Sequence, residues 1–76
     1  MKIGVIGAGA WGTAFAIHLA RTGEKVLLWA YEKELLPDLR ERRENTAFLP
    51  GFRLDEAIDH TDNLQEATDF SDTVVI

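Results

Sequence analysis

The chain has 76 residues, with 8 basic and 13 acidic side chains and a formal net charge of −5 at pH 7. This acidic balance argues against general binding to nucleic acid, whose phosphates attract basic surfaces. The absence of cysteine excludes disulfides, thiol catalysis and zinc–thiolate sites within these residues. No apolar stretch has the length of a membrane span and no signal peptide is recognisable, so we expect a cytoplasmic protein without a membrane partner.

The amino-terminal end combines a β-rich run with three regularly spaced glycines. Residues 3–6 favour a short strand, and Gly7, Gly9 and Gly12 follow it at G-x-G-x-x-G spacing. In such a turn, Gly7 permits the tight reversal from strand to helix, and Gly9 lets the backbone approach a pyrophosphate. Gly12 lets the following helix pack close to the strand. The pattern predicts a dinucleotide-binding turn, against the alternative of a glycine-rich turn that holds no ligand.

A helix is predicted from Ala10 to Thr22, with Gly23 as its stop. The backbone amides of residues 8–12, including those of Ala10 and Trp11, would then face phosphate oxygens at a helix N-terminus. The helix dipole favours negative charge at that end. The Trp11 side chain has two readings, as a wall of the cofactor site or as an aromatic group packed under a second domain.

The apolar side of this helix is unusually broad. Only a narrow stripe through His18, Arg21 and Thr22 is polar, whereas a helix covered on one side usually shows a wider polar face. We therefore expect the helix to be buried by the sheet and also by a further part of the protein.

The rest of the chain alternates between predicted strands and helices. A strand over 25–30 is apolar at nearly every position, as a parallel strand covered on both faces should be. Pro37 is tolerated only in the first turn of the helix that follows, which would place the start of its regular part near Leu36. The remaining predicted elements are a helix over 34–44, a loop over 48–51, a strand over 57–60, a helix from Asp62, as N-cap, to Ala67, and a buried strand over 73–76.

This alternation, with right-handed crossovers, predicts a Rossmann-like α/β fold with a parallel sheet of order 3-2-1-4 and flanking helices. The first and fourth strands then flank the switch point, where a dinucleotide crosses the carboxyl ends of the strands. The apolar run at 73–76 is followed by no turn signal. We therefore expect residues 1–76 to be the N-terminal part of a dinucleotide-binding domain that is incomplete at its C-terminus, with a catalytic domain beyond it.

Three motifs make a more specific resemblance. The turn from Gly7 to Ala14, the R-E-N-x-x-aromatic-L-P-G loop from Arg43 to Gly51 and a T-D-x-x-x-A-like segment from Thr61 to Ala67 resemble bacterial-type NAD(P)-dependent glycerol-3-phosphate dehydrogenases. The resemblance covers the whole chain. It implies NAD or NADP as cofactor and a small phosphorylated substrate, with reduction of dihydroxyacetone phosphate to sn-glycerol 3-phosphate for phospholipid synthesis. It is also compatible with a homodimer of the full-length protein.

Two departures from the family pattern concern the cofactor. Ala10 stands where the family commonly has a serine, so a hydroxyl that could bond a phosphate is missing. Tyr31 stands where relatives often have Arg or His. An acid at the end of the second strand would bind the ribose 2′-hydroxyl of NAD, and an arginine would accept the 2′-phosphate of NADP. Tyr31 either lies along the adenosine or is a solvated tyrosine after the strand. Together with Glu32 and Lys33 it gives no single answer, so both cofactors stay open.

Other candidate side chains are weaker. Phe48 either closes the adenine side of the cofactor site or anchors its loop to the core. The arginines at 40, 42 and 43 alternate with acids at spacings typical of solvated ion pairs, such as Asp38 to Arg42. His60 with its neighbouring acids does not make a metal site, and His18 has no partner at a catalytic spacing. No residue here is a convincing general acid or base, so we expect the catalytic residues downstream.

Two other functions remain possible on the sequence alone. One is a different NAD(P)-dependent dehydrogenase of the 6-phosphogluconate or ketopantoate reductase type, although such proteins more often carry Asn-Arg or similar residues after the second strand. The other is a non-catalytic nucleotide-sensing domain. Residues that follow position 76 would distinguish them, since a catalytic lysine there indicates an enzyme.

Overall fold

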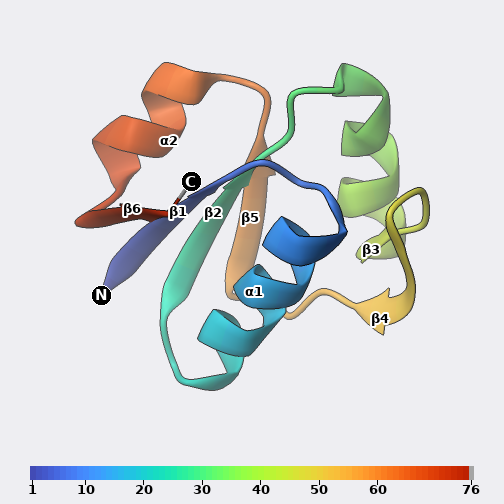
Figure 1. The fold of residues 1–76 in the computed structure, drawn as a ribbon, viewed down its shortest axis with the longest axis horizontal. Helices are drawn as coiled ribbons and strands as arrows, with labels where there is room; N and C mark the ends of the chain where they lie inside the picture. Colours follow the sequence, from blue (N-terminus) through green and yellow to red (C-terminus); the bar gives the residue numbers. More distant parts are fainter. Residues whose placement is uncertain (76) are drawn as a thin grey trace.

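In a computed structural model that describes residues 1–75, four strands form a parallel sheet. They lie in the order β5-β2-β1-β6, which is the predicted order 3-2-1-4 (Figure 1). The strands are β1 (Lys2–Ile6), β2 (Lys25–Trp29), β5 (Ile58–Thr61) and β6 (Thr73–Val75). The α/β fold predicted from the alternation of apolar runs is therefore confirmed.

Two helices, α1 (Ala10–Arg21) and α2 (Leu64–Phe70), cover opposite faces of this sheet (Figure 1). Side chains of neighbouring residues in a strand point to opposite faces. A Cβ built on Gly4 of β1 would overlap Ser71 at the end of α2. The next residue, Val5, lies on the other face, with its Cγ1 3.6 Å from a Cβ built on Gly12 of α1. A glycine in each layer thus allows close packing of helix and sheet.

The core lies between these layers. Val26, Leu27 and Leu28 of β2 are all buried, as expected of a central parallel strand covered on both faces. Leu39 and Leu54 are fully buried as well and extend the core toward the segment between β2 and β5. Ala8 and Ala30, in the loops that follow β1 and β2, belong to the same core, which anchors these loops.

The prediction of one regular helix over 34–44 is wrong. A 3₁₀ turn, η1 (Lys33–Leu35), is followed by a π-helical turn, η2 (Asp38–Arg42). Proline has no N–H, so Pro37 cannot donate the hydrogen bond that a regular helix would make to the carbonyl of Lys33. The N–H of Leu36 donates to that carbonyl instead, which closes a tighter turn.

The loop predicted over 48–51 is partly strand. β3 (Glu44–Asn45) and β4 (Leu49–Arg53) form an antiparallel hairpin that contains a register irregularity. Most of β4 is exposed, and it includes Pro50 and Gly51, the latter at φ +88°. Proline is tolerated at a sheet edge because its missing N–H is not needed there. An exposed strand with turn residues inside it lacks the alternation that would have predicted it.

Three further boundaries shift. β5 begins one residue later than the strand predicted over 57–60. The N-cap of α2 is Asn63 rather than Asp62, because the Asn63 side chain accepts the N–H of Glu66 at 3.1 Å. The strand predicted as buried over 73–76 is exposed at Thr73 and Val74, since β6 lies at an edge of the sheet and pairs only with β1 among the described residues. Its last position, 76, lies outside the described residues.

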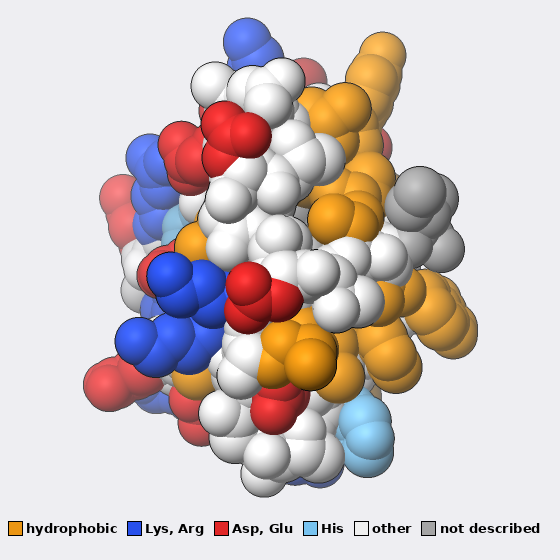
Figure 2. Space-filling view, turned by 90° about the vertical axis from the view of Figure 1, so that its left-hand side faces the viewer, with side chains coloured by type: hydrophobic (Ala, Val, Ile, Leu, Met, Phe, Trp, Pro, Cys, Tyr) orange, Lys and Arg blue, Asp and Glu red, His pale blue; other side chains and the backbone are white. Residues whose placement is uncertain are grey.

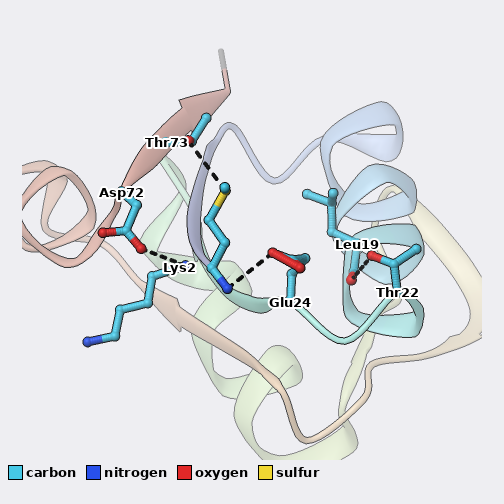
Figure 3. Close-up of polar contacts among 7 residues, drawn as sticks. Lys2, Leu19, Thr22, Glu24, Asp72 and Thr73 are labelled. Atoms are coloured by element: carbon cyan, nitrogen blue, oxygen red, sulfur yellow. Dashed lines mark hydrogen bonds and ion pairs between the residues drawn. The ribbon is translucent and has the colours of Figure 1, made fainter.

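The amino-terminal edge of the sheet is held by polar contacts (Figure 3). The N–H of Lys2 donates to Asp72 at 3.1 Å, and the amino group of Met1 lies 3.3 Å from Glu24. The Thr22 hydroxyl donates to the Leu19 carbonyl at 2.7 Å, at the end of α1. The first two contacts tie the start of β1 to the residues just before β6 and β2, at the end of the sheet opposite the glycine turn, and the third closes the end of α1.

Candidate functional site

The glycine turn lies between the carboxyl end of β1 and the start of α1. Gly7 has φ +117°, a conformation that side chains with a Cβ rarely adopt, so the reversal depends on glycine at this position. Its N–H donates to the carbonyl of Trp29 at 3.1 Å, which links the turn to the end of β2. A Cβ on Gly12 would overlap the carbonyl oxygen of Gly7. The first turn of α1 therefore packs directly on the glycine turn.

Gly9 differs from these two glycines. Its φ of −75° and ψ of −173° are open to any residue, and a Cβ built on it would have no neighbour within 4 Å. Neither the fold nor the packing of the described residues therefore requires glycine at position 9. Exposed backbone without a side chain leaves room for a ligand to approach, which is the role that the spacing predicts for this position.

The start of α1 has no acceptor from its own side chains. Gly9 is the N-cap residue, no side chain caps the helix, and its first turn contains no acid. The first amides of a helix lack partners within the helix, and the helix dipole is positive there. Together with the exposed Gly9 and Ala10, this end of α1 can accept an anionic group.

Trp11 stands beside these amides and is 64% exposed. Its ring stacks on that of Phe15 with centroids 5.1 Å apart. The Phe15 ring also stacks on that of His18, with centroids 6.4 Å apart. This aromatic row along the exposed side of α1 is compatible with both predicted roles of Trp11. Figure 2 shows hydrophobic side chains gathered along one side of the face in view, apart from most of the charged ones.

Tyr31, Glu32 and Lys33 lie together after the carboxyl end of β2. Tyr31 is 76% exposed, and its ring meets that of Trp29 edge-on at 5.8 Å. The ammonium group of Lys33 lies 3.9 Å from Asp62. A cavity of about 480 Å³ is lined by Trp29, Tyr31, Glu32, Lys33, Glu34 and Asp62. Three carboxylates and one ammonium make this cavity acidic.

Phe48 lies in the turn of the β3–β4 hairpin and is 44% exposed, so it neither fills the core nor stands free. Its N–H donates to the Asn45 side chain at 3.2 Å. Asn45 is fully buried and donates to the Ala8 carbonyl at 2.7 Å and to the Thr13 hydroxyl at 2.9 Å. The hairpin is thus bonded to the glycine turn through a residue that the sequence analysis missed. The only signal was its place in the R-E-N motif, because sequence alone does not show that an asparagine is buried.

Two of the three candidate arginines, Arg42 and Arg43, have structural partners. The predicted pair of Asp38 and Arg42 is present at 3.4 Å. Arg43, expected to be solvated, instead donates to the carbonyls of Asp55 and Ile58 and has φ +53°. Its guanidinium satisfies backbone acceptors where the hairpin meets β5, a long-range contact that local charge spacing could not indicate.

His60 is half-buried, and its Nδ1 has no hydrogen-bond partner among the described residues. Burial, followed by the charges of Arg40 and Arg43, lowers the pKa of His60 below its ordinary value of 6.5, although Asp59 opposes the shift. Within residues 1–75 no cluster of three or more His, Asp or Glu side chains is placed to hold a metal ion.

The predicted cofactor residues therefore come together at one end of the sheet. The turn from Gly7 to Gly12 is bonded to the end of β2, after which residues 31–33 line their cavity, and Asn45 joins it to the loop of Phe48. This is the carboxyl end of the parallel strands, where nucleotides bind in open α/β sheets. Fold and site together define a nucleotide-binding domain of the Rossmann class. None of the described helices has the length and apolar character needed to cross a membrane.

Comparison with known proteins identifies the family. Residues 2–76 match the family described as NAD-dependent glycerol-3-phosphate dehydrogenase N-terminus, and the chain belongs to it. This confirms the resemblance found in the glycine turn and the L-P-G loop. The names of the family and of its members also agree with the expected enzyme class and with NAD or NADP as cofactor.

Relatives and solved structures agree with this assignment. The chain is 54% identical over 66 residues to a glycerol-3-phosphate dehydrogenase [NAD(P)+] of Citrifermentans bemidjiense, covering 87% of this chain and 20% of the relative. It is 51% identical over 75 residues to that of Geobacter sulfurreducens, covering 99% of this chain and 22% of the relative. The chain thus spans about a fifth of the length of these curated relatives.

Among solved structures, the glycerol-3-phosphate dehydrogenase of Coxiella burnetii has a TM-score of 0.89 and 33% identity, covering 96% of this chain and 22% of that one. The enzyme of Saccharomyces cerevisiae has a TM-score of 0.87 and 28% identity, covering 97% of this chain and 25% of that one. The parallel sheet with its flanking helices is therefore shared with known dehydrogenases of this kind.

Proposed function

We propose that these residues form the adenosine-side part of the cofactor site of an NAD(P)-dependent glycerol-3-phosphate dehydrogenase. The full-length protein would reduce dihydroxyacetone phosphate to sn-glycerol 3-phosphate, which supplies phospholipid synthesis. The observation that carries the proposal is the glycine turn. Gly7 and Gly12 are required by backbone geometry and close packing, whereas the structure gives Gly9 no such requirement. A ligand at the turn explains a glycine that the fold does not need.

In this proposal the segment binds and orients the cofactor. The cofactor supplies the hydride when bound, and the protein must hold it against the substrate carbonyl and polarise that carbonyl. The start of α1 would hold the pyrophosphate through backbone amides, with Ala10 contributing an amide and no hydroxyl. Trp11 and Phe48 would flank the cofactor, and Tyr31, Glu32 and Lys33 would lie near the adenosine ribose. Carbonyl polarisation and substrate binding would come from residues beyond this segment.

Gly9→Val tests the proposal in the full-length protein, meaning a protein of the relatives' length that begins with these residues. Valine readily adopts the extended backbone of Gly9, so the fold should be retained. The branched side chain would stand where the pyrophosphate approaches, and we expect the Kd and KM for the cofactor to rise at least tenfold. Gly9→Ala should give a smaller rise. An unchanged cofactor titration in a folded Gly9→Val protein would contradict the assigned site.

The alternative functions make different predictions for the wild-type protein. Turnover of 6-phosphogluconate or ketopantoate, with none of dihydroxyacetone phosphate, would indicate the other reductase type. Cofactor binding without turnover of any of these would indicate a sensing domain.

The cytoplasmic location, the lack of a nucleic-acid or membrane partner and the homodimer stay predictions, to be measured by fractionation and by light scattering of the full-length protein.

A further inference from the structure

Asn45 makes three hydrogen bonds to three different parts of the candidate site. Its side chain is fully buried, and its Nδ2 donates both to the Ala8 carbonyl in the glycine turn at 2.7 Å and to the Thr13 hydroxyl of α1 at 2.9 Å. Its Oδ1 accepts the N–H of Phe48 in the hairpin turn at 3.2 Å. One carboxamide therefore joins the glycine turn, the helix and the hairpin.

The bond to Ala8 has a geometric consequence for Gly9. The Ala8 carbonyl and the Gly9 N–H belong to the same peptide group, which is planar and trans, so they point in opposite directions. Asn45 draws the Ala8 carbonyl toward the buried side of the turn. The Gly9 N–H is thereby directed away from Asn45, on the side where a Cβ on Gly9 would meet no other atom within 4 Å.

Only a side chain with both donors and an acceptor can make the three bonds of Asn45, and a carboxamide is the side chain of that length which has them. It offers two N–H donors and a carbonyl acceptor, whereas an ionised aspartate offers acceptors only. Aspartate at position 45 would face the Ala8 carbonyl with a second acceptor, and the buried carbonyl would lose its partner. The Ala8–Gly9 peptide group would then be free to turn, and the direction of the Gly9 N–H would no longer be fixed.

We infer that Asn45 is a positioning residue for cofactor binding, which aims the Gly9 amide at the pyrophosphate by holding the Ala8 carbonyl and which keeps the Phe48 loop beside the turn. Asn45 itself is buried and acts through the backbone of the turn. The inference rests on the proposed function, because it assigns the ligand of the Gly9 amide to the phosphates of NAD(H) or NADP(H). It adds a specific role for a residue outside the glycine motif.

The test compares Asn45→Asp with Thr13→Val in the full-length protein. Thr13→Val has a similar volume and removes only the hydroxyl that accepts from Asn45, leaving the bond to Ala8 in place. Both substitutions should lower the melting temperature, since each leaves a buried polar group without its partner. NADH and NADPH are titrated by the quenching of tryptophan fluorescence, well below both melting temperatures.

We expect Asn45→Asp to raise the cofactor Kd at least tenfold, and Thr13→Val less than threefold. The cofactor KM should rise with Kd while kcat changes little, because the lost interaction holds cofactor equally in ground state and transition state. If Asn45→Asp does not fold, Asn45→Ser is titrated in its place. The serine hydroxyl is shorter and has one donor, so it cannot replace the three hydrogen bonds of Asn45. We expect the same rise in the cofactor Kd.

The possible failures are distinguishable. A wild-type protein that binds neither NADH nor NADPH overturns the proposed function and the inference with it. A wild-type protein that binds cofactor, with variants at position 45 whose Kd stays within twofold of it, overturns the inference alone. Equal rises in Kd for Thr13→Val and Asn45→Asp also overturn it, because loss of general rigidity would then account for the effect.

Discussion

Tyr31, Glu32 and Lys33 occupy the position at which Rossmann-type proteins distinguish NAD from NADP. In this chain the position combines an exposed aromatic ring with opposite charges, and Lys33 lies within 3.9 Å of Asp62. The cavity that these residues line contains three carboxylates and one ammonium group. With the adenosine ribose in this cavity, as proposed, the carboxylates would repel a 2′-phosphate and accept a hydrogen bond from a 2′-hydroxyl, so we expect a preference for NADH over NADPH.

Glu32→Arg in the full-length protein should shift this preference toward NADPH. The substitution removes one carboxylate and adds a guanidinium, which binds phosphate well. We expect the ratio of kcat/KM for NADPH to that for NADH to increase about tenfold or more, with little change in the melting temperature. Glu41→Arg makes the same charge change on an exposed residue outside the cavity and serves as the control. An unchanged ratio for Glu32→Arg would mean that Glu32 does not face the ribose.

The element that brings the site together is the turn between β1 and α1, and its two structural glycines act differently. Gly7 supplies a backbone conformation that other residues rarely adopt, and Gly12 supplies the space in which α1 approaches the turn. Gly9 has an ordinary conformation and open space around its Cα. Stability and ligand binding should therefore be separable by substitutions three residues apart.

Gly12→Ala should destabilise the full-length protein, because its Cβ would overlap the backbone carbonyl of Gly7 and force α1 away from the turn. Overpacking of this kind typically costs about 1–3 kcal/mol. Gly9→Ala is the matched control and should change stability much less, since its Cβ has no neighbour within 4 Å and its φ of −75° suits alanine. The urea midpoints of the two variants give the comparison. Equal midpoints would show that the close packing of Gly12 on the glycine turn does not contribute to stability.

Some of the helices and strands could be predicted from the sequence and others could not. The strand–turn–helix at the start and the order of the parallel strands follow from periodic apolar residues and glycine spacing. The β3–β4 hairpin is exposed and holds Pro50 and Gly51, so it has no apolar alternation to reveal it. Asn45 was missed because its role depends on burial against Ala8 and Thr13, over 30 residues away in sequence, and no local pattern reports such a contact.

On the scale of the whole molecule, the sheet and its two helices leave several large apolar side chains in solvent. Trp11 is 64% exposed, Phe52 53% and Phe48 44%, and Val74 of the edge strand β6 is 39% exposed. The sequence led us to expect a further part of the protein over the broad apolar side of α1. Among the described residues, Trp11 and Ala14 on this helix are exposed. Large exposed apolar groups of this kind typically mark surfaces that pack against other protein.

Residues 1–76 expressed alone should therefore be marginally stable or prone to aggregate. They should bind NADH or NADPH weakly and reduce no dihydroxyacetone phosphate, because the proposed site supplies binding groups and no catalytic acid or base. Circular dichroism during heating, light scattering and a dehydrogenase assay measure these properties. Phe52→Ser removes an exposed aromatic side chain outside the core and should reduce the scattering without raising the melting temperature. A cooperative melt well above room temperature would show that this surface needs no further cover, and measurable turnover would show that catalytic residues lie within these 76 positions.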